Sequence, residues 1–491
     1  VEGYMGYPLK HWLRYQFRRS DYVKWGFLAS QDAGEPFFAG KNKWGYDFYS
    51  FYLQVKKWGR WKNITLGRYR LSEGMGLILN NDFGFGKLSA LSSLGRMGTS
   101  IRVHSSRSSA NYLQGAAATL NVAKGLDVSA FVSYRTIDAT VKSDSISTIQ
   151  TSGLHRTELE IEKQGAAKAF LAGGNLHYSF KGFHVGATGI FYSYSLPLYP
   201  DKSQLYKRFA PEGKSFWNMS VDYGYVSHRL TMQGETAMGV ATVNSMSYLF
   251  SEKWSLLALY RFYPYRYYAM YSNSFKAGSD VQDESGGYVG MRWTPSAKWM
   301  VEAYGDVAYF AWPKYHTTGS TYAMDYLVSA VCQLSSFISM GARYQYKWKN
   351  EATTQRARLY LRMNRSAWSS KTQVDATWLS GSRGYMASEA FAYRYRWLRL
   401  QASMGYFHTS DYDSRVYALE PGMLYTMSFG SYFGEGIRCA LLAKVDVGSH
   451  WLLACKWAMT QYFDRNHISS GLQQINGSCQ SDLELQLKWK W

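Results

Sequence analysis

Arginine and lysine recur at every second position in several segments of the chain, a spacing that suits the binding of anions. In QRARLYLRMN, residues 355–364, Arg356, Arg358 and Arg362 alternate with apolar residues. Successive side chains of a β-strand point to opposite faces, so the three guanidinium groups would share one face and attract phosphate or carboxylate groups. The same parity predicts a basic, lumen-facing surface that also includes Lys371, Arg438, Lys444, Lys456, Lys488 and Lys490.

Other polar residues suggest catalysis or metal binding more weakly. His155 lies in a loop segment with Glu158 and Glu160, a set that could transfer protons, but a lone loop histidine is more often structural. Asp411 and Asp413 could hold calcium, yet the remaining ligands of an EF-type loop are absent. We therefore predict no catalytic residue, no metal site and no cofactor, and we do not expect an enzyme.

A tyrosine-rich stretch, YRFYPYRYYAMY at 260–271, has two interpretations. Aromatic rings interleaved with arginine would stack on bases or sugars. Tyrosine also collects where a membrane-spanning strand meets the interface, and we favour such a girdle running into a loop. The residues concerned are Tyr260, Tyr263, Tyr265, Arg266, Tyr267 and Tyr268.

The glycine-rich segment 74–98 resembles a phosphate-binding loop only superficially. It lacks GxxxxGK[ST] and is not expected between a parallel strand and a helix. The connection that it begins, 74–110, is long, and long connections usually have a task. A wide barrel lumen must be plugged or gated, so we expect 74–110 to fold inward.

The elements that position these residues are β-strands. In the last ten residues, DLELQLKWKW, leucine and tryptophan alternate strictly with polar residues. Aromatic residues make up 17% of the chain, while a mean hydropathy of −0.33 excludes a bundle of transmembrane helices. A transmembrane β-barrel in the bacterial outer membrane reconciles these facts. The predicted lipid-facing or girdle residues are Leu483, Leu485, Leu487, Trp489, Trp491 and Trp457.

Short turns and long loops should alternate along such a barrel. We predict tight turns near 58–61, 123–127, 180–184, 251–254, 295–299, 364–368 and 447–451. Long outer loops are expected at 33–45, 74–110, 143–168, 197–214, 265–284, 312–320, 411–435 and 464–481. About 23 strands result, the first near 11–18, and an antiparallel barrel normally has an even number. We therefore expect about 24 strands, with the first strand upstream of residue 1.

The four cysteines carry no expected chemistry. Cys332, Cys439 and Cys455 fall at lipid-facing strand positions, and Cys479 lies beside the last strand. Cys439 should lie opposite position 460 or so, which is too far from Cys455 for a disulfide. No CxxC or Cys/His cluster with metal spacing occurs.

Nearly the whole chain resembles the C-terminal barrel of the large helix-hairpin-helix proteins of Bacteroidota, often named ComEA-family DNA-binding proteins. In that family a periplasmic helix-hairpin-helix region precedes the barrel, and DNA binding belongs to those upstream repeats. The resemblance therefore implies architecture more than activity. The segments that carry it are DAGEPFF (32–38), GRYRLSEGMGLIL (67–79), SGLHRTELE (152–160), YRFYPYRYYAMYSNSF (260–275), FAWPKY (310–315), YDSRVYALE (412–420) and FDRNHISSGLQQI (463–475).

The net charge of +20 has two explanations. Basic residues could simply meet lipopolysaccharide and phospholipid head groups, or they could line a conduit for a polyanion. Three function classes stay open: a gated or plugged translocation channel, related to DNA uptake if the upstream resemblance holds; a non-conducting docking barrel for other outer-membrane or periplasmic proteins; and, least favoured, an enzyme. We expect these residues alone to bind duplex DNA only weakly.

Overall fold

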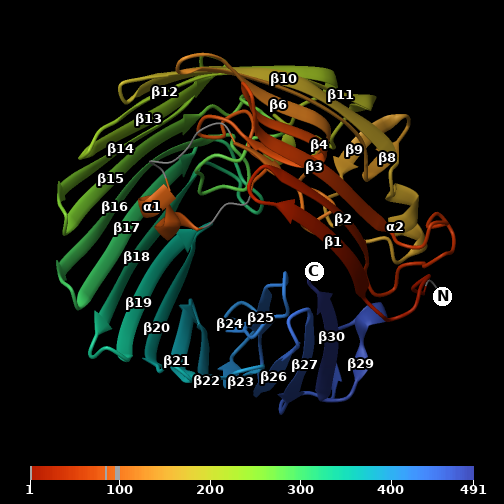
Figure 1. Ribbon diagram of the computed structural model, residues 1–491, viewed down its shortest axis with the longest axis vertical. Helices are drawn as coiled ribbons and strands as arrows, with labels where there is room; N and C mark the ends of the chain where they lie inside the picture. The colour runs from red at the N-terminus through yellow and green to blue at the C-terminus, as the bar shows by residue number, and fades with distance from the viewer. Residues whose placement is uncertain (1–2, 83–85, 94–99) are drawn as a thin grey trace. The chain divides into compact units, whose positions relative to one another are not determined.

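The fold is all-β, as the alternation predicts. The computed structural model describes residues 3–82, 86–93 and 100–491 (Figure 1). Strands hold 63% of the residues and helices 4%, and 26 strands belong to one large antiparallel sheet. Among the described residues, no helix is long and apolar enough to cross a membrane.

The chain divides into two compact units. Unit 1 comprises residues 1–249, 256–289 and 307–322. Its strands pair antiparallel in the order β1, β2, β3, β4, β6, β7, β10, β11, β12, β13 and β14. The elements that lie wholly in unit 1 are β1 (His11–Arg19), β2 (Val23–Gln31), β3 (Phe48–Trp58), β4 (Trp61–Ser72), α1 (Ala90–Ser93), β5 (Ser100–Val103), β6 (Leu113–Ala123), β7 (Leu126–Ile137), β8 (Ala139–Lys142), β9 (Ser145–Ile149), α2 (Glu158–Lys163), β10 (Ala167–Phe180), β11 (Phe183–Leu198), β12 (Gly213–Val226) and β13 (Leu230–Ala237).

Unit 2 comprises residues 250–255, 290–306 and 323–491. Its strands pair antiparallel in the order β18, β19, β20, β21, β22, β23, β26, β27 and β30. Five strands have residues in both units: β14 (Ala241–Ser251), β15 (Trp254–Tyr263), β16 (Glu284–Ser296), β17 (Trp299–Phe310) and β18 (Thr321–Gln333). The remaining strands are β19 (Ile338–Lys349), β20 (Ala352–Asn364), β21 (Trp368–Leu379), β22 (Ser382–Tyr395), β23 (Leu398–Thr409), β24 (Val416–Glu420), β25 (Ser428–Tyr432), β26 (Glu435–Val447), β27 (Trp451–Tyr462), β28 (His467–Ile468), β29 (Ile475–Asn476) and β30 (Cys479–Trp489).

The strand count agrees with the sequence pattern. Three of the 26 strands in the large sheet, β5, β8 and β9, have only four or five residues; β5 and β9 lie within predicted long loops, and β8 ends just before the predicted loop 143–168. The other 23 have at least eight residues, which is the number of strands that the alternation predicts. The predicted tight turns are also confirmed, because each joins two successive strands.

Turn chemistry explains one of these connections directly. Gly125, between β6 and β7, has φ +79, a conformation that favours glycine. A Cβ atom at this position would lie 2.3 Å from the carbonyl oxygen of Ser179 on β10. Glycine therefore permits both the tight turn and the close approach of the neighbouring strand.

Burial is inverted relative to a water-soluble sheet. In unit 1, Trp217 and Met219 on β12 are each 58% exposed, whereas the alternate residues Asn218 and Ser220 are 2% and 5% exposed. An apolar outward face opposite a polar, buried face is the arrangement of a transmembrane barrel wall.

Unit 2 repeats this inversion. On β27 Trp457 is 42% exposed and the neighbouring Lys456 is 3% exposed. All the predicted lipid-facing or girdle residues have exposed side chains: Leu483, Leu485, Leu487, Trp489, Trp491 and Trp457. The expected separation of Cys439 and Cys455 is confirmed, because they pair across the hairpin with Met459 and Ala443, and all four cysteines are free.

The two faces should be distinguishable by chemical labelling in a lipid bilayer. Leu359 and Arg362 lie on opposite faces of β20 and are both exposed in the protein itself. In nanodiscs of a variant without the native cysteines, a water-soluble maleimide should modify Arg362→Cys and spare Leu359→Cys, because lipid covers the latter. Modification of position 359 in preference to 362 would reverse the assigned faces.

Candidate functional site

A group of cations on adjacent strands of unit 2 forms the first part of the candidate site. We define the basic face as Arg343 on β19, Arg356, Arg358 and Arg362 on β20, and Lys371 on β21. Arg343 lies directly opposite Arg358, and Arg362 directly opposite Lys371. Like charges in direct opposition destabilise a sheet, so this arrangement favours a ligand of opposite charge.

Acidic residues compensate the basic face only in part. Among the residues directly opposite its members, the single carboxylate is Asp375, whose Oδ1 accepts a hydrogen bond from Nε of Arg358 at 2.6 Å. Nε of Arg356 is buried and has no hydrogen-bond partner among the described residues. Positive charge therefore exceeds negative charge on this part of the polar face.

A second set of cations crosses three further strands. Arg394 on β22 lies opposite Arg399 on β23, and Arg399 lies opposite Lys444 on β26. Asp446 accepts a hydrogen bond from Arg399 at 2.8 Å. These three cations and Arg365 help to line a cavity of about 350 Å³. Around this cavity, too, the cations of the described polar face outnumber Asp446.

The hairpin of β24 and β25 folds onto this face (Figure 1). Its anchor is Glu420, which is 4% exposed and accepts two hydrogen bonds from Arg438 on β26, at 2.7 and 3.0 Å. Nζ of Lys456 on β27 lies 3.6 Å from the same carboxylate, and the Tyr432 hydroxyl donates to it. A bidentate, buried ion pair of this kind fixes orientation as well as position.

The tip of the hairpin makes further contacts with the polar face. Nζ of Lys444 donates to the Gly422 carbonyl at 3.1 Å, and Nζ of Lys488 donates to the Tyr425 hydroxyl at 3.0 Å. Met423 packs in a small cluster with Leu442, Leu452 and Ala454. Within the predicted long loop 411–435, the hairpin thus folds onto the polar face, because a buried carboxylate and apolar side chains hold it there; the sequence predicts inward folding only for 74–110.

The predicted lumen-facing cations consequently fall into two groups. Arg438, Lys444, Lys456 and Lys488 contact the hairpin, whereas Arg358, Arg362 and Lys371 belong to the basic face beside it. Arg356, also on the basic face, has its guanidinium 5.6 Å from the ring of Tyr417 on the hairpin. Lys490 follows the end of β30, where its backbone pairs with His450. A cavity of about 120 Å³ lies between the hairpin and the basic face. Its lining includes Arg358 and Lys371 from the basic face and Glu420 from the hairpin.

In unit 1, a different segment lies on the polar face. Leu77, Ile78 and Leu79 are fully buried, and one carboxylate oxygen of Glu235 on β13 accepts the backbone N–H groups of Met75 and Leu77 at 2.7 and 3.0 Å. The described part of the predicted inward loop 74–110 thus contacts a buried acid from another strand. Residues 83–85 and 94–99 of that loop lie outside the described residues.

The tyrosine-rich stretch holds this segment from the other side. The Tyr267 hydroxyl donates to the Leu77 carbonyl at 2.8 Å, and the Tyr271 carbonyl accepts from the Asn80 amide at 2.8 Å. Tyr263 and Tyr267 are 1% and 4% exposed, so these two rings form neither an open stacking surface nor a lipid-facing girdle. Their burial follows from packing against the inward segment, which the local sequence does not reveal.

The other tyrosine-rich candidates divide differently. Tyr260 is exposed on β15, and Tyr265 is partly exposed beside Arg266, whose guanidinium lies 5.7 Å from the Tyr265 ring. Tyr268 contacts Phe216 edge to face at 5.6 Å. Arg261 pairs with Glu284, and both side chains are fully buried. The stretch mainly anchors loops within unit 1.

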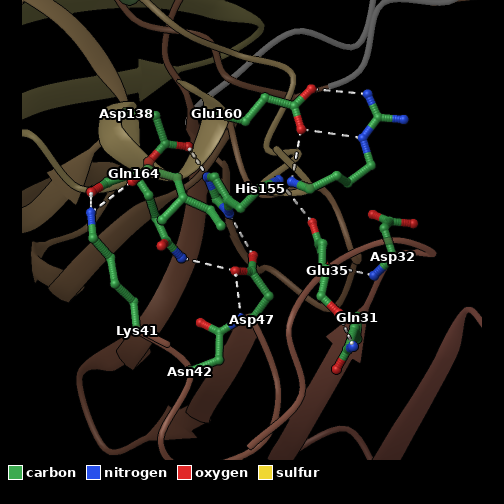
Figure 2. A network of polar contacts seen from close by, with 12 residues as sticks. Gln31, Asp32, Glu35, Lys41, Asn42, Asp47, Asp138, His155, Glu160 and Gln164 are labelled. Carbon is green, nitrogen blue, oxygen red and sulfur yellow. Dashed lines mark hydrogen bonds and ion pairs between the residues drawn. The ribbon is translucent and has the colours of Figure 1, made fainter. Parts of the chain in front are cut away.

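His155 is the centre of a network of loop residues in unit 1 (Figure 2). Its Nδ1 lies 2.7 Å from Oδ2 of Asp47, and its Nε2 lies 3.1 Å from Oδ2 of Asp138. The backbone N–H of His155 donates to Oε1 of Glu35 at 3.1 Å. The histidine is therefore not isolated, although its partners are too distant in sequence for spacing to predict.

Electrostatics in this network reflect crowded carboxylates. Burial, together with the charge of Asp47, raises the pKa of Glu35 to about 7. Burial lowers the pKa of His155, but hydrogen bonds to Asp138 and Asp47 outweigh that effect and raise it to about 10. The loops thus favour positive charge at this position.

The remaining acidic candidates have structural roles in the described chain. Glu160 pairs with Arg156 at 2.9 Å and completes a capping box with Thr157 at the start of α2. Asp411 accepts the Ser414 amide and the Ser382 hydroxyl, while the Asp413 side chain is 78% exposed. Asp411 therefore stabilises a turn, without gathering the ligands of a calcium loop.

The chain matches no protein-family model and no curated protein. Solved structures with a similar fold include OccAB2 of Acinetobacter baumannii (11% identity, TM-score 0.34), covering 66% of this chain and 91% of that one. The FrpB iron transporter of Neisseria meningitidis shows 9% identity and a TM-score of 0.40, with coverages of 90% and 73%. The P pilus usher (PapC) translocation pore shows 10% identity and a TM-score of 0.36, and the match covers 100% of this chain and 93% of that one. At these low scores, the activities of the neighbours are not transferred to this chain.

The anchoring role of Glu420 can be tested by hydrogen–deuterium exchange. Glu420→Gln would remove the carboxylate through which the hairpin holds Arg438 and Lys456; the carboxylates that remain near them, Asp482 at 3.8 Å from Arg438 and Glu484 at 3.4 Å from Lys456, belong to β30 and do not hold the hairpin. Amides of residues 416–432 should therefore exchange faster. Asp413→Asn, which neutralises an exposed carboxylate of the same loop, should leave that exchange unchanged; equal rates in both variants would contradict the anchoring role.

Proposed function

We propose that this protein is an outer-membrane barrel that translocates anionic solutes, with its own inward-folded segments restricting passage. The observation that carries the proposal is the opposition of Arg343 to Arg358 and of Arg362 to Lys371 on one polar face. A structural sheet gains nothing from such pairs, because they repel one another. An anion that moves along the face would be attracted at each pair in turn.

The folded segments support the gating part of the proposal. The β24–β25 hairpin contacts cations of the polar face through one buried carboxylate, Glu420. In unit 1, Glu235 holds the Met75–Leu79 turn through backbone hydrogen bonds. Each attachment places a carboxylate of the chain among polar-face groups, so an entering anion would compete directly with Glu420 for Arg438 and Lys456.

A non-conducting docking barrel is the second candidate. The burial of Glu420, Arg438 and Lys456 favours it, because a permanently fixed hairpin would make the polar face a structural interior. The two candidates differ in one measurable property, ion conduction. DNA is one polyanion that the basic face would attract, but the described residues do not favour it over smaller anions; a link to DNA uptake rests on the family resemblance alone.

The selectivity of reconstituted protein tests the translocation proposal. In a planar bilayer under a KCl gradient, we expect the reversal potential to indicate preference for chloride. Arg362→Glu combined with Lys371→Glu should weaken or reverse that preference. Because the double variant keeps two like charges in direct opposition, its effect on folding should be small.

A matched control removes positive charge away from this face. Arg396→Glu alters a turn residue between β22 and β23 and should preserve the anion preference. A wild-type protein that conducts without anion preference would contradict the proposal. Absence of conduction under all conditions would instead support the docking barrel.

A further inference from the structure

Three acidic and imidazole groups converge in the loops of unit 1. One ligand atom each from Glu35, Asp47 and His155 lies within 4.8 Å of the others. Glu35 and His155 are buried, and Asp47 is half-buried. The network brings together two loop segments that are more than a hundred residues apart in the chain (Figure 2).

We propose that Glu35, Asp47 and His155 form a binding site for a divalent transition-metal ion, with Zn²⁺ as the best-fitting ion. Imidazole nitrogen and carboxylate oxygen are ligands that zinc accepts together. The ion would sit between Nδ1 of His155 and the carboxylates of Asp47 and Glu35. It would take the place of the proton that Nδ1 shares with Asp47, and that proton would pass to solvent.

In metal sites, the residues that bind the ion are usually held in place by hydrogen bonds to neighbouring residues, and the three proposed ligands have such neighbours. Asp138 accepts a hydrogen bond at Nε2 of His155, the nitrogen that points away from Asp47, and Asp138 is itself held by the Gly165 amide at 2.9 Å. A ligating histidine commonly donates its second ring N–H to a carboxylate, which fixes its tautomer and strengthens the ligand.

The two carboxylates are oriented in the same way. Oδ1 of Asp47 accepts hydrogen bonds from Gln164 at 2.8 Å and Asn42 at 3.1 Å, while Oδ2 faces His155. Oε2 of Glu35 accepts the Asp32 amide at 2.7 Å. Each ligand is thus held by a donor from the surrounding loops.

Charge and space both favour a cation at this position. Four carboxylates lie in this network, those of Asp32, Glu35, Asp47 and Asp138, whereas His155 pairs with two of them and Lys10 with Asp32. A polar cavity of about 90 Å³ borders Asp32, Glu35 and Asp47, and serine and threonine residues and Arg107 also line it. It has room for water molecules that would complete the coordination of a bound ion.

A bound ion would connect the loops near the start of the chain. The 32–47 loop supplies Glu35 and Asp47, and the segment before α2 supplies His155. Residues 5 and 6 join the same assembly, through hydrogen bonds from Met5 N to the Arg156 carbonyl and from Gly6 N to the Gly34 carbonyl, at 2.8 and 2.9 Å. Without an ion, the 32–47 loop and the segment before α2 are connected by a few polar contacts. The metal would add a direct link between them.

Equilibrium dialysis of the detergent-purified full chain against Zn²⁺, after treatment with a chelator, tests this site. We expect one tightly bound ion per chain. Glu35→Gln and Asp47→Asn should each weaken binding about tenfold or more, and Asp138→Asn should weaken it through the outer partner. Glu160→Gln, which neutralises a carboxylate of the same network outside the ligand set, should bind like the wild type.

Hydrogen–deuterium exchange gives a second readout, which locates the bound ion in these loops instead of counting ions per chain. Zn²⁺ should slow exchange of amides in 32–47 and 150–166 in the wild type and leave Glu35→Gln unaffected. Glu35→Gln keeps the size of the side chain and one acceptor oxygen, but the N–H of either Asp32 or His155 loses its partner, so the exchange of this variant without Zn²⁺ is the reference for its response to the ion. The proposal is overturned if the wild type binds no zinc, or if Glu35→Gln, Asp47→Asn and His155→Gln all bind it with wild-type affinity.

Discussion

The strands have an apolar, exposed face and a polar, largely buried face. A charged group on the polar face needs a partner of opposite charge, a hydrogen bond or water, because a buried charge without one is costly. Three buried glutamates meet this requirement with loop contacts. Glu420 binds Arg438 and Lys456, and Glu235 accepts two amides of the inward turn. Glu284 pairs with Arg261 on β15 and also accepts the amides of Ala277 and Gly278 in the preceding loop. The positions of the inward-folded segments depend on these carboxylates, since the strands themselves would form without them.

The proposed function depends on the cations of the polar face that have few carboxylate partners. The basic face has one directly opposed carboxylate, Asp375, for several arginines and a lysine. In the neighbouring strands, the hairpin supplies the counter-charge and occupies the surface. The polar face of unit 2 thus has a covered part and a part that offers positive charge to a solute. The loop network around His155 shows the opposite imbalance, with carboxylates in excess, and is therefore suited to a cation.

Local periodicity was sufficient to predict the strands, their tight turns and the two faces. Alternation in residues 355–364 predicts three arginines on one face, and the register pairs two of them with Arg343 on β19 and Lys371 on β21. Periodicity could not predict the inward folding of the hairpin or the burial of Tyr267. These depend on pairs such as Glu235 with Met75, 160 residues apart, and Asp47 with His155, 108 residues apart. Only the fold brings these groups together.

The central claim is that the β24–β25 hairpin restricts a path along the basic polar face. Val416 and Tyr432 are directly paired, so a short Gly-Ser linker could replace the residues from one to the other without stretching the flanking chain. The most direct measurement is the single-channel conductance of that variant in a planar bilayer. The account predicts a larger conductance than that of the wild type, with anion preference retained. Unchanged conductance would contradict it.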